Sequence, residues 1–243
     1  MPTKCYIGTS GWNYPHWKDK FYPTNIKKDD WLSFYSKKFN TTEINYSFYR
    51  WPTEKTMKDW YDNSPYHFEY TMKSPRMITH MKKLKNPEPW VDDFYDLTSI
   101  LKEKIGCHLF QLPPNYKHTG HNMGKLRKFI ETLDKRKKNV IEFRDRSWWN
   151  KDVYDLFKVN NIIFCNVSGL GMPDEIVKTS DIIYFRFHGN NYSTKYTDKE
   201  LRKHADKMKH IDAQRIYVHF NNDQNAFAPH NALWLKEQLE GGT

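Results

Sequence analysis

The sequence predicts an α/β fold, a single (β/α)8 barrel of the TIM type. Eight short apolar or β-branched segments recur along the 243 residues, and segments with helical spacing separate nearly all of them. No stretch rich in glycine, serine or proline divides the chain, so we expect one domain over residues 1–243. An open, doubly wound sheet is the competing arrangement, because periodicity does not distinguish a closed barrel from an open edge.

Each expected strand is a run of four to eight residues with apolar or alternating character. The strands are expected at residues 4–8, 41–46, 67–72, 107–112, 140–143, 162–167, 182–187 and 215–220. Helices are expected at residues 30–39, 53–63, 90–105, 122–136, 150–159 and 228–240. A further helix begins at the capping box Thr197-Asp198-Lys199-Glu200. The connection at residues 173–179 has weak helical character, and we expect a short helix there.

The composition indicates a protein with a large aromatic core and a basic surface. Aromatic residues make up 16% of the chain, and the formal net charge is +10. An excess of positive charge favours polyanionic partners such as nucleic acid or phosphorylated ligands. The lysines are scattered over the expected helices, however, so a solvated surface accounts for part of the excess. No run of 18 apolar residues occurs, which excludes a membrane-spanning helix.

Two features of the sequence predict a cytoplasmic protein. The three cysteines, Cys5, Cys107 and Cys165, lie in apolar runs without a C-x-x-C motif, as is typical of free thiols in a reducing compartment. Residues 1–6 contain no apolar segment typical of a secretory signal.

Polar side chains occupy alternate positions in several expected strands. They are Glu43 and Asn45; Glu69, Thr71 and Lys73; Glu142 and Arg144; Asn166 and Ser168; Tyr184, Arg186 and His188; and Tyr217, His219, Asn221 and Asp223. A period of two sends them to one face of each strand, and the opposite, apolar face must meet the covering helices. We therefore expect the polar face to point into the barrel and to form a site at the carboxyl ends of the strands.

Seven ordered motifs carry a resemblance to a known family. They are Gly8-Thr9-Ser10-Gly11-Trp12; Phe39-Asn40-Thr41-Thr42-Glu43-Ile44-Asn45 with Phe48-Tyr49; Ile78-Thr79-His80; Phe110-Gln111-Leu112-Pro113-Pro114; Glu142-Phe143-Arg144 with Trp148; Arg186-Phe187-His188-Gly189; and Phe220-Asn221-Asn222-Asp223 with Ala228, Asn231 and Ala232. Over nearly the whole chain the sequence resembles the YecE-like family, domain of unknown function 72. The resemblance implies a TIM-type barrel and no established activity. The family's barrel is similar to those of endonuclease IV and xylose isomerase, which suggests a phosphodiester or sugar ligand by analogy.

Four residues are candidate catalytic groups. Two of the carboxylates Glu43, Glu142 and Asp223 could act as general acid and base on a glycoside, and His188 could act as a general base. The alternative is that these carboxylates form buried ion pairs with the basic residues of the same face.

Nine further residues are candidate ligand contacts. Lys73, Arg144 and Arg186 would bind an anion, because their donors match phosphate or carboxylate oxygens. Aromatic rings in the loops at the barrel mouth could stack on bases or sugars, and amide side chains could bind the same ligand. These residues are Trp12, Tyr49 and Trp148, with Asn45, Gln111 and Asn221.

No cofactor is predicted from the sequence. No H-E-x-x-H, Walker or dinucleotide-binding glycine motif occurs, so a divalent metal stays open but has no motif to support it. The turn Gly8-Thr9-Ser10-Gly11 could offer backbone N–H groups to a phosphate, although a tight turn is the simpler interpretation.

Three hypotheses about function follow. The first is a barrel that binds, and potentially hydrolyses, a small anionic or phosphate-bearing ligand at its carboxyl-end mouth, with nucleic acid as one candidate. The second is a carbohydrate-active barrel with paired carboxylates, and the third is a non-catalytic ligand-binding protein. Whether the protein is an enzyme, and its oligomeric state, stay open.

Overall fold

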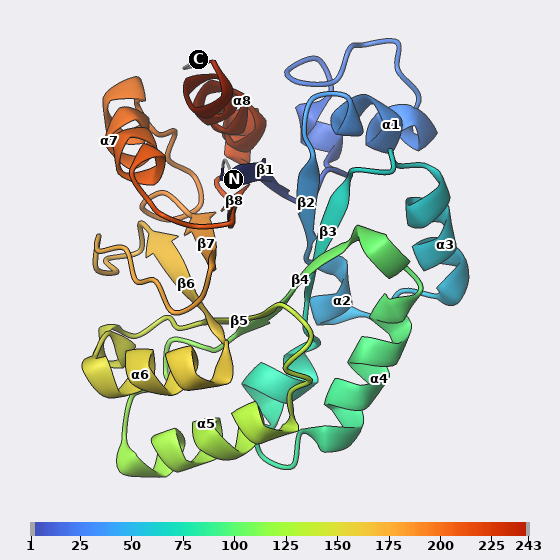
Figure 1. Cartoon of the computed structure of the whole chain (residues 1–243). Helices are drawn as coiled ribbons and strands as arrows, with labels where there is room; N and C mark the ends of the chain where they lie inside the picture. Colours follow the sequence, from blue (N-terminus) through green and yellow to red (C-terminus); the bar gives the residue numbers. More distant parts are fainter. Residues whose placement is uncertain (1–2, 242–243) are drawn as a thin grey trace.

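Eight parallel strands close into a barrel in sequence order, with the last strand paired to the first (Figure 1). The computed structural model describes residues 3–241, so residues 1, 2, 242 and 243 of the expected domain lie outside the described residues. The strands are β1 Lys4–Ser10, β2 Thr41–Ile44, β3 Glu69–Lys73, β4 Ile105–Gln111, β5 Asn139–Glu142, β6 Ile163–Ser168, β7 Ile182–Phe187 and β8 Arg215–Phe220. The predicted (β/α)8 barrel is confirmed, and the open sheet is excluded because β1 pairs with both β2 and β8.

Helices surround the strands on the outside of the barrel (Figure 1). They are α1 Trp31–Ser36, α2 Tyr46–Tyr49, α3 Glu54–Asp62, α4 Glu88–Ser99, α5 Gly120–Thr132, α6 Lys151–Asn160, α7 Asp198–Lys209 and α8 Phe227–Glu240. The expected capping box is present, because the Thr197 hydroxyl accepts a hydrogen bond from Glu200 N and the Glu200 carboxylate accepts one from Thr197 N. Helix α4 ends six residues earlier than expected, at Ser99, since Lys102 adopts a left-handed conformation that leads into β4.

The connection between β6 and β7 contains no helix within the described residues, so the expected helix at 173–179 is wrong (Figure 1). The chain instead runs extended along the outside of β6. The Asn166 carboxamide accepts from Val177 N at 2.7 Å and donates to Val177 O at 3.2 Å. Thr179 Oγ1 accepts from Phe164 N at 2.9 Å and donates to Ile162 O at 2.6 Å. Asn166 thus satisfies the backbone groups of Val177 in the connection, and Thr179 satisfies backbone groups at the start of β6.

This arrangement also reverses the expected orientation of β6. Asn166 and Ser168 were expected to point into the barrel, but both are turned outward, toward the extended segment and α7. Cys165 and Val167 point inward and pack with apolar residues of the neighbouring strands. The three cysteines are free thiols, and Cys107 joins Cys165 in this inner layer.

The amino end of the barrel is closed by side chains. The Tyr6 and Tyr217 rings stack with centroids 4.7 Å apart, and Glu69 accepts from Tyr217 OH at 2.5 Å and from Arg215 Nη1 at 2.9 Å. Above them an apolar layer that includes Leu109 fills the middle. The interior is therefore polar only at its two ends, and less polar than strand alternation suggested.

Gly8 allows a close approach between β1, β2 and α1. The Tyr35 hydroxyl inserts between the two strands, where it accepts from Thr9 N at 2.8 Å and donates to Thr41 O at 3.1 Å. A Cβ atom at Gly8 would lie 2.1 Å from Thr41 O and 2.8 Å from the Tyr35 hydroxyl. The turn that follows is closed by a hydrogen bond from Gly11 N to Thr9 O. The N–H groups of Thr9 and Gly11 are therefore both bonded within the protein.

Gly8→Ala is expected to lower the free energy of unfolding by about 3 kcal/mol, because the new methyl group overpacks the strand pair. Gly124→Ala is the matched control: a Cβ atom there meets nothing within 4 Å, on an exposed face of α5. This change should raise the free energy of unfolding by about 0.5–1 kcal/mol through helix propensity. Urea denaturation measures both, and equal midpoints for the two variants would contradict the close approach at Gly8.

Candidate functional site

A buried ion-pair cluster lies at the carboxyl end of the barrel, and Arg186 on β7 is at its centre. Arg186 Nη2 lies 2.5 Å from Glu43 Oε1, and Arg186 Nη1 lies 2.6 Å from Glu142 Oε2. The Tyr184 hydroxyl donates to the other Glu43 oxygen at 2.9 Å. All four side chains are fully buried. Strands β2, β5 and β7 are thereby joined across the barrel.

A second arginine, Arg144, joins the cluster on the side of the barrel mouth. Arg144, which follows β5, donates through Nε to Glu142 Oε1 and through Nη1 to the Tyr192 hydroxyl at 2.5 Å. Its Nη2 lies 3.1 Å from His188 Nε2. Because a guanidinium group only donates, Nε2 accepts, and the ring proton lies on Nδ1, which faces the Asn221 carboxamide at 3.2 Å.

Both carboxylates are held in the ionised form. Burial alone would raise the pKa of Glu43, but Arg186, His219 and Lys73 outweigh burial and hold it at about 2. Burial opposes ionisation of Glu142 as well, and Arg144 and Arg186 keep its pKa well below the usual value. A glycosidase needs one carboxyl group that is protonated at neutral pH and faces the substrate. Glu43 and Glu142 meet neither condition.

His188 is neutral at physiological pH. Burial, followed by the charge of Arg144, lowers its pKa to about 3, although Glu142 acts in the opposite direction. Its ring is fully buried between Arg144 and Asn221. A base with so low a pKa is poorly matched to proton abstraction near pH 7. The geometry makes His188 an acceptor that orients Arg144.

Lys73, at the end of β3, is a cation of this mouth that has no ion-pair partner among residues 3–241, whereas Arg144 and Arg186 are both paired. Its side chain is largely buried, and its Nζ lies 4.1 Å from the centroid of the Phe48 ring. Burial, with the charges of Arg186 and Arg144, lowers the pKa of Lys73 to about 7, while Glu43 and Glu142 act in the opposite direction. Two carboxylates thus balance the two arginines, and Lys73 is the surplus positive charge.

A cavity of about 440 Å³, which we call the aromatic hollow, lies between the loops after β1 and β2 and helix α3. Trp12 and Tyr14 line it from the loop after β1, Asn45 and Tyr49 from the loop and helix after β2, and Trp60 from α3. The Trp12 and Trp60 rings meet edge to face at 5.7 Å. The expected contacts Trp12, Asn45 and Tyr49 therefore share one cavity. At its edge the Tyr49 ring contacts the Phe48 ring, which in turn contacts Lys73.

Three expected site residues lie apart from this cluster. Asp223 lies at the rim, with its carboxylate 3.6 Å from His16 Nε2, and burial raises its pKa. Trp148 is fully buried between Tyr116 and Phe143, so it has no ring face free for a ligand. Gln111 is adjacent to Glu142 in the sheet, but its amide donates to Leu112 O.

Several interior groups were missed as site residues. Tyr184 binds Glu43, and the buried hydroxyls of Ser10 and Thr71 have no hydrogen-bond partner within the described part of the chain. Thr71 and Tyr184 share the strand parity of Lys73 and Arg186, so alternation alone could have identified them. Alternation does not show how far along the barrel axis a side chain lies. This position decides which side chains contact one another.

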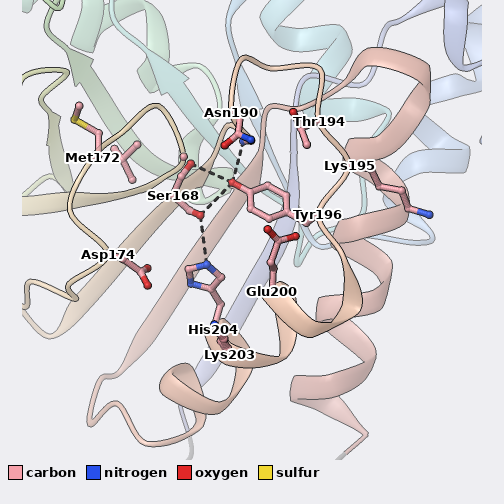
Figure 2. A pocket seen from close by; sticks show the side chains of 13 residues that line it. Ser168, Met172, Asp174, Asn190, Thr194, Lys195, Tyr196, Glu200, Lys203 and His204 are labelled. Carbon is pink, nitrogen blue, oxygen red and sulfur yellow. Dashed lines mark hydrogen bonds between the residues drawn. The ribbon is translucent and has the colours of Figure 1, made fainter.

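A second cavity, of about 240 Å³, lies outside the barrel where the β6–β7 connection lacks a helix. Figure 2 shows Ser168, Tyr196 and His204 pointing toward one another in it, with Ser168 Oγ 3.3 Å from His204 Nε2 and 3.1 Å from the Tyr196 hydroxyl. No carboxylate among residues 3–241 is hydrogen-bonded to His204. We interpret this network as structural, since it ties the end of β6 to α7.

Metal binding has no support in the arrangement of the side chains. Across the described residues, no group of three or more His, Cys, Asp or Glu is placed to hold a metal ion.

None of the helices in residues 3–241 has the length and apolar character needed to cross a lipid bilayer.

A closed parallel barrel with a polar cluster at the carboxyl ends of its strands defines a TIM-type barrel protein. A family model described as "Protein of unknown function DUF72" matches residues 6–243, and the chain belongs to this family. The fold is similar to that of a DUF72 family protein from Thermotoga maritima, with a TM-score of 0.91 and 28% identity over 98% of this chain and 99% of that one. A DUF72 family protein from Enterococcus faecalis has a TM-score of 0.83 at 19% identity, over 97% of this chain and 95% of that one. No curated protein matches the sequence.

Arg186→Met is expected to lower the free energy of unfolding by about 3–5 kcal/mol at pH 7, because it leaves two buried carboxylates without their shared partner. Without Arg186 the pKa of Glu43 rises above its unfolded value. The deficit relative to the wild type is therefore largest above about pH 5 and shrinks at lower pH as the carboxylates take up protons. Urea denaturation at pH 7 and at about pH 4.5 tests this.

Arg136→Met is the matched control. Arg136 forms an exposed pair with Asp134, so its loss should leave the free energy of unfolding nearly unchanged. Similar losses for the two variants would show that the Arg186 cluster does not dominate the barrel interior.

Proposed function

We propose that the protein binds a phosphate-bearing ligand at the carboxyl-end mouth of the barrel, with Lys73 and Arg144 as the cationic groups. The observation that carries the proposal is the uncompensated charge of Lys73. A largely buried ammonium group without a carboxylate partner is costly, and an anion from solution relieves that cost by favouring the charged form.

The donors around this mouth fit a group with several oxygens. Lys73 offers a compact charge, and Arg144 offers a planar fork that is anchored by Glu142 and Tyr192. A phosphate group has more acceptor oxygens than a carboxylate, so it satisfies more of these donors.

Hydrolysis is not part of the proposal. Glu43, Glu142 and His188 have strongly lowered pKa values, so they are weak bases at neutral pH. The carbohydrate-active alternative is disfavoured for the same reason, and because Glu43 and Glu142 are closed to solvent.

Sulfate binding should weaken as pH rises through about 7, because Lys73 then loses its proton while sulfate keeps its two negative charges. The expected loss is about tenfold in affinity for each pH unit above 7. Titration calorimetry between about pH 6 and pH 9 measures the dependence. An affinity that does not change across this range would contradict the role of Lys73.

Lys73→Met should abolish sulfate binding and at the same time stabilise the protein. In the folded state the pKa of Lys73 is about 7, below its unfolded value, so protonation favours unfolding. That penalty is fully present below pH 7 and is relieved between about pH 7 and pH 10. We expect the variant to gain about 1–3 kcal/mol at about pH 6 and less at about pH 10.

Lys128→Met, on the exposed surface of α5, is the control and should change neither property. A destabilised Lys73→Met variant would mean that Lys73 is a structural ion-pair residue, which would overturn the proposed function.

A further inference from the structure

The aromatic hollow exposes rings that core packing does not require. Tyr49 is 76% exposed and Tyr46 is 48% exposed, and both belong to the short helix α2 at the edge of the hollow. Large rings are among the most favourable residues to bury, so two neighbouring exposed rings around a cavity indicate a surface kept for a ligand.

A chain of ring contacts connects Lys73 with the edge of the hollow. Lys73 Nζ lies 4.1 Å from the Phe48 ring centroid, and the Phe48 ring meets the Tyr49 ring edge to face at 5.0 Å. Tyr49 in turn lines the hollow. A ligand that spans the Phe48 and Tyr49 rings can therefore place a phosphate on Lys73 and its remaining part in the hollow.

The polar groups of the hollow are few. The Tyr14 hydroxyl is already used, because it donates to Ser10 O at 2.6 Å. Asn45 Oδ1 is buried and has no hydrogen-bond partner in the part of the chain that the structure describes. A sugar ring carries a hydroxyl on most carbons and needs many partners, whereas a nucleobase has two apolar faces and hydrogen-bonding groups along one edge.

We propose that the aromatic hollow binds a nucleobase, so that the phosphate-bearing ligand of this barrel is a nucleotide. This inference rests on the proposed function, since it assigns the other half of the same ligand. The base stacks against the tyrosine and tryptophan rings, the Asn45 carboxamide pairs with the edge of the base, and the phosphate lies on Lys73 and Arg144.

Binding of three ligands to the wild-type protein tests the inference. Adenosine 5′-monophosphate should bind about 10- to 100-fold more tightly than ribose 5-phosphate, which lacks the base. Adenosine, which lacks the phosphate, should bind more weakly than the monophosphate. Equal affinities for the monophosphate and ribose 5-phosphate would overturn the nucleobase assignment and leave phosphate binding intact. Failure of sulfate and both phosphate esters to bind would overturn the proposed function itself.

Variants at the hollow separate its role from folding. Tyr49→Ala should weaken adenosine 5′-monophosphate about tenfold without changing ribose 5-phosphate, and Tyr49→Phe should restore binding, because the ring and not the hydroxyl stacks. Tyr66→Ala is the matched control, since Tyr66 is 80% exposed and precedes β3 at the other end of the barrel. Equal effects of Tyr49→Ala on both phosphate esters would overturn the base-stacking role.

One further ligand distinguishes a free nucleotide from the end of a strand. A 5′-phosphorylated oligodeoxyadenylate that binds more tightly than the monophosphate supports the same base and phosphate contacts and assigns them to a strand terminus. Weaker binding of the oligonucleotide supports a free nucleotide as the ligand.

Discussion

The interior of this barrel depends on one guanidinium group that is shared by two carboxylates. Arg186 binds Glu43 and Glu142 and so connects three strands at the depth where the apolar filling ends. The pairing makes it possible for charged groups to be buried at all, because each is neutralised and hydrogen-bonded. Arg144, His188 and Lys73 follow Glu142, Arg186 and Thr71 by two residues each, so they lie one step nearer the mouth than this pairing. The candidate site is therefore a consequence of how the barrel buries charge.

The sequence was sufficient for the fold because a (β/α)8 barrel repeats one simple unit. Eight apolar runs gave strands that differ from the observed ones by at most two residues at either end. The exception is the β6–β7 connection, where hydrogen bonds from Asn166 and Thr179 to the backbone replace a helix. A local pattern shows that a residue is polar, but not that its amide satisfies the backbone of a segment eleven residues away.

The sequence predicted which residues of the candidate site point inward better than it predicted their contacts. Alternation correctly placed Glu43, Glu142 and Arg186 on the inward face, and the possibility that they pair with one another was open from the sequence. The depth of each side chain was not predictable, because it depends on strand register across the sheet. Register explains why Tyr184 contacts Glu43 and why Asp223 lies at the rim. Trp148 belongs to the packing of the wall because two aromatic rings cover its faces.

The closed amino end of the barrel limits how a ligand can enter and leave. The stacked tyrosines and the Glu69–Arg215 pair close the barrel at that end, so a ligand can approach the cluster only from the carboxyl-end mouth. A polymer cannot thread along the barrel axis, so any long molecule that uses this mouth has to present a terminus or a unit turned out of its chain. A ligand then enters and leaves by the same route. A bound ligand must dissociate before the next one can bind.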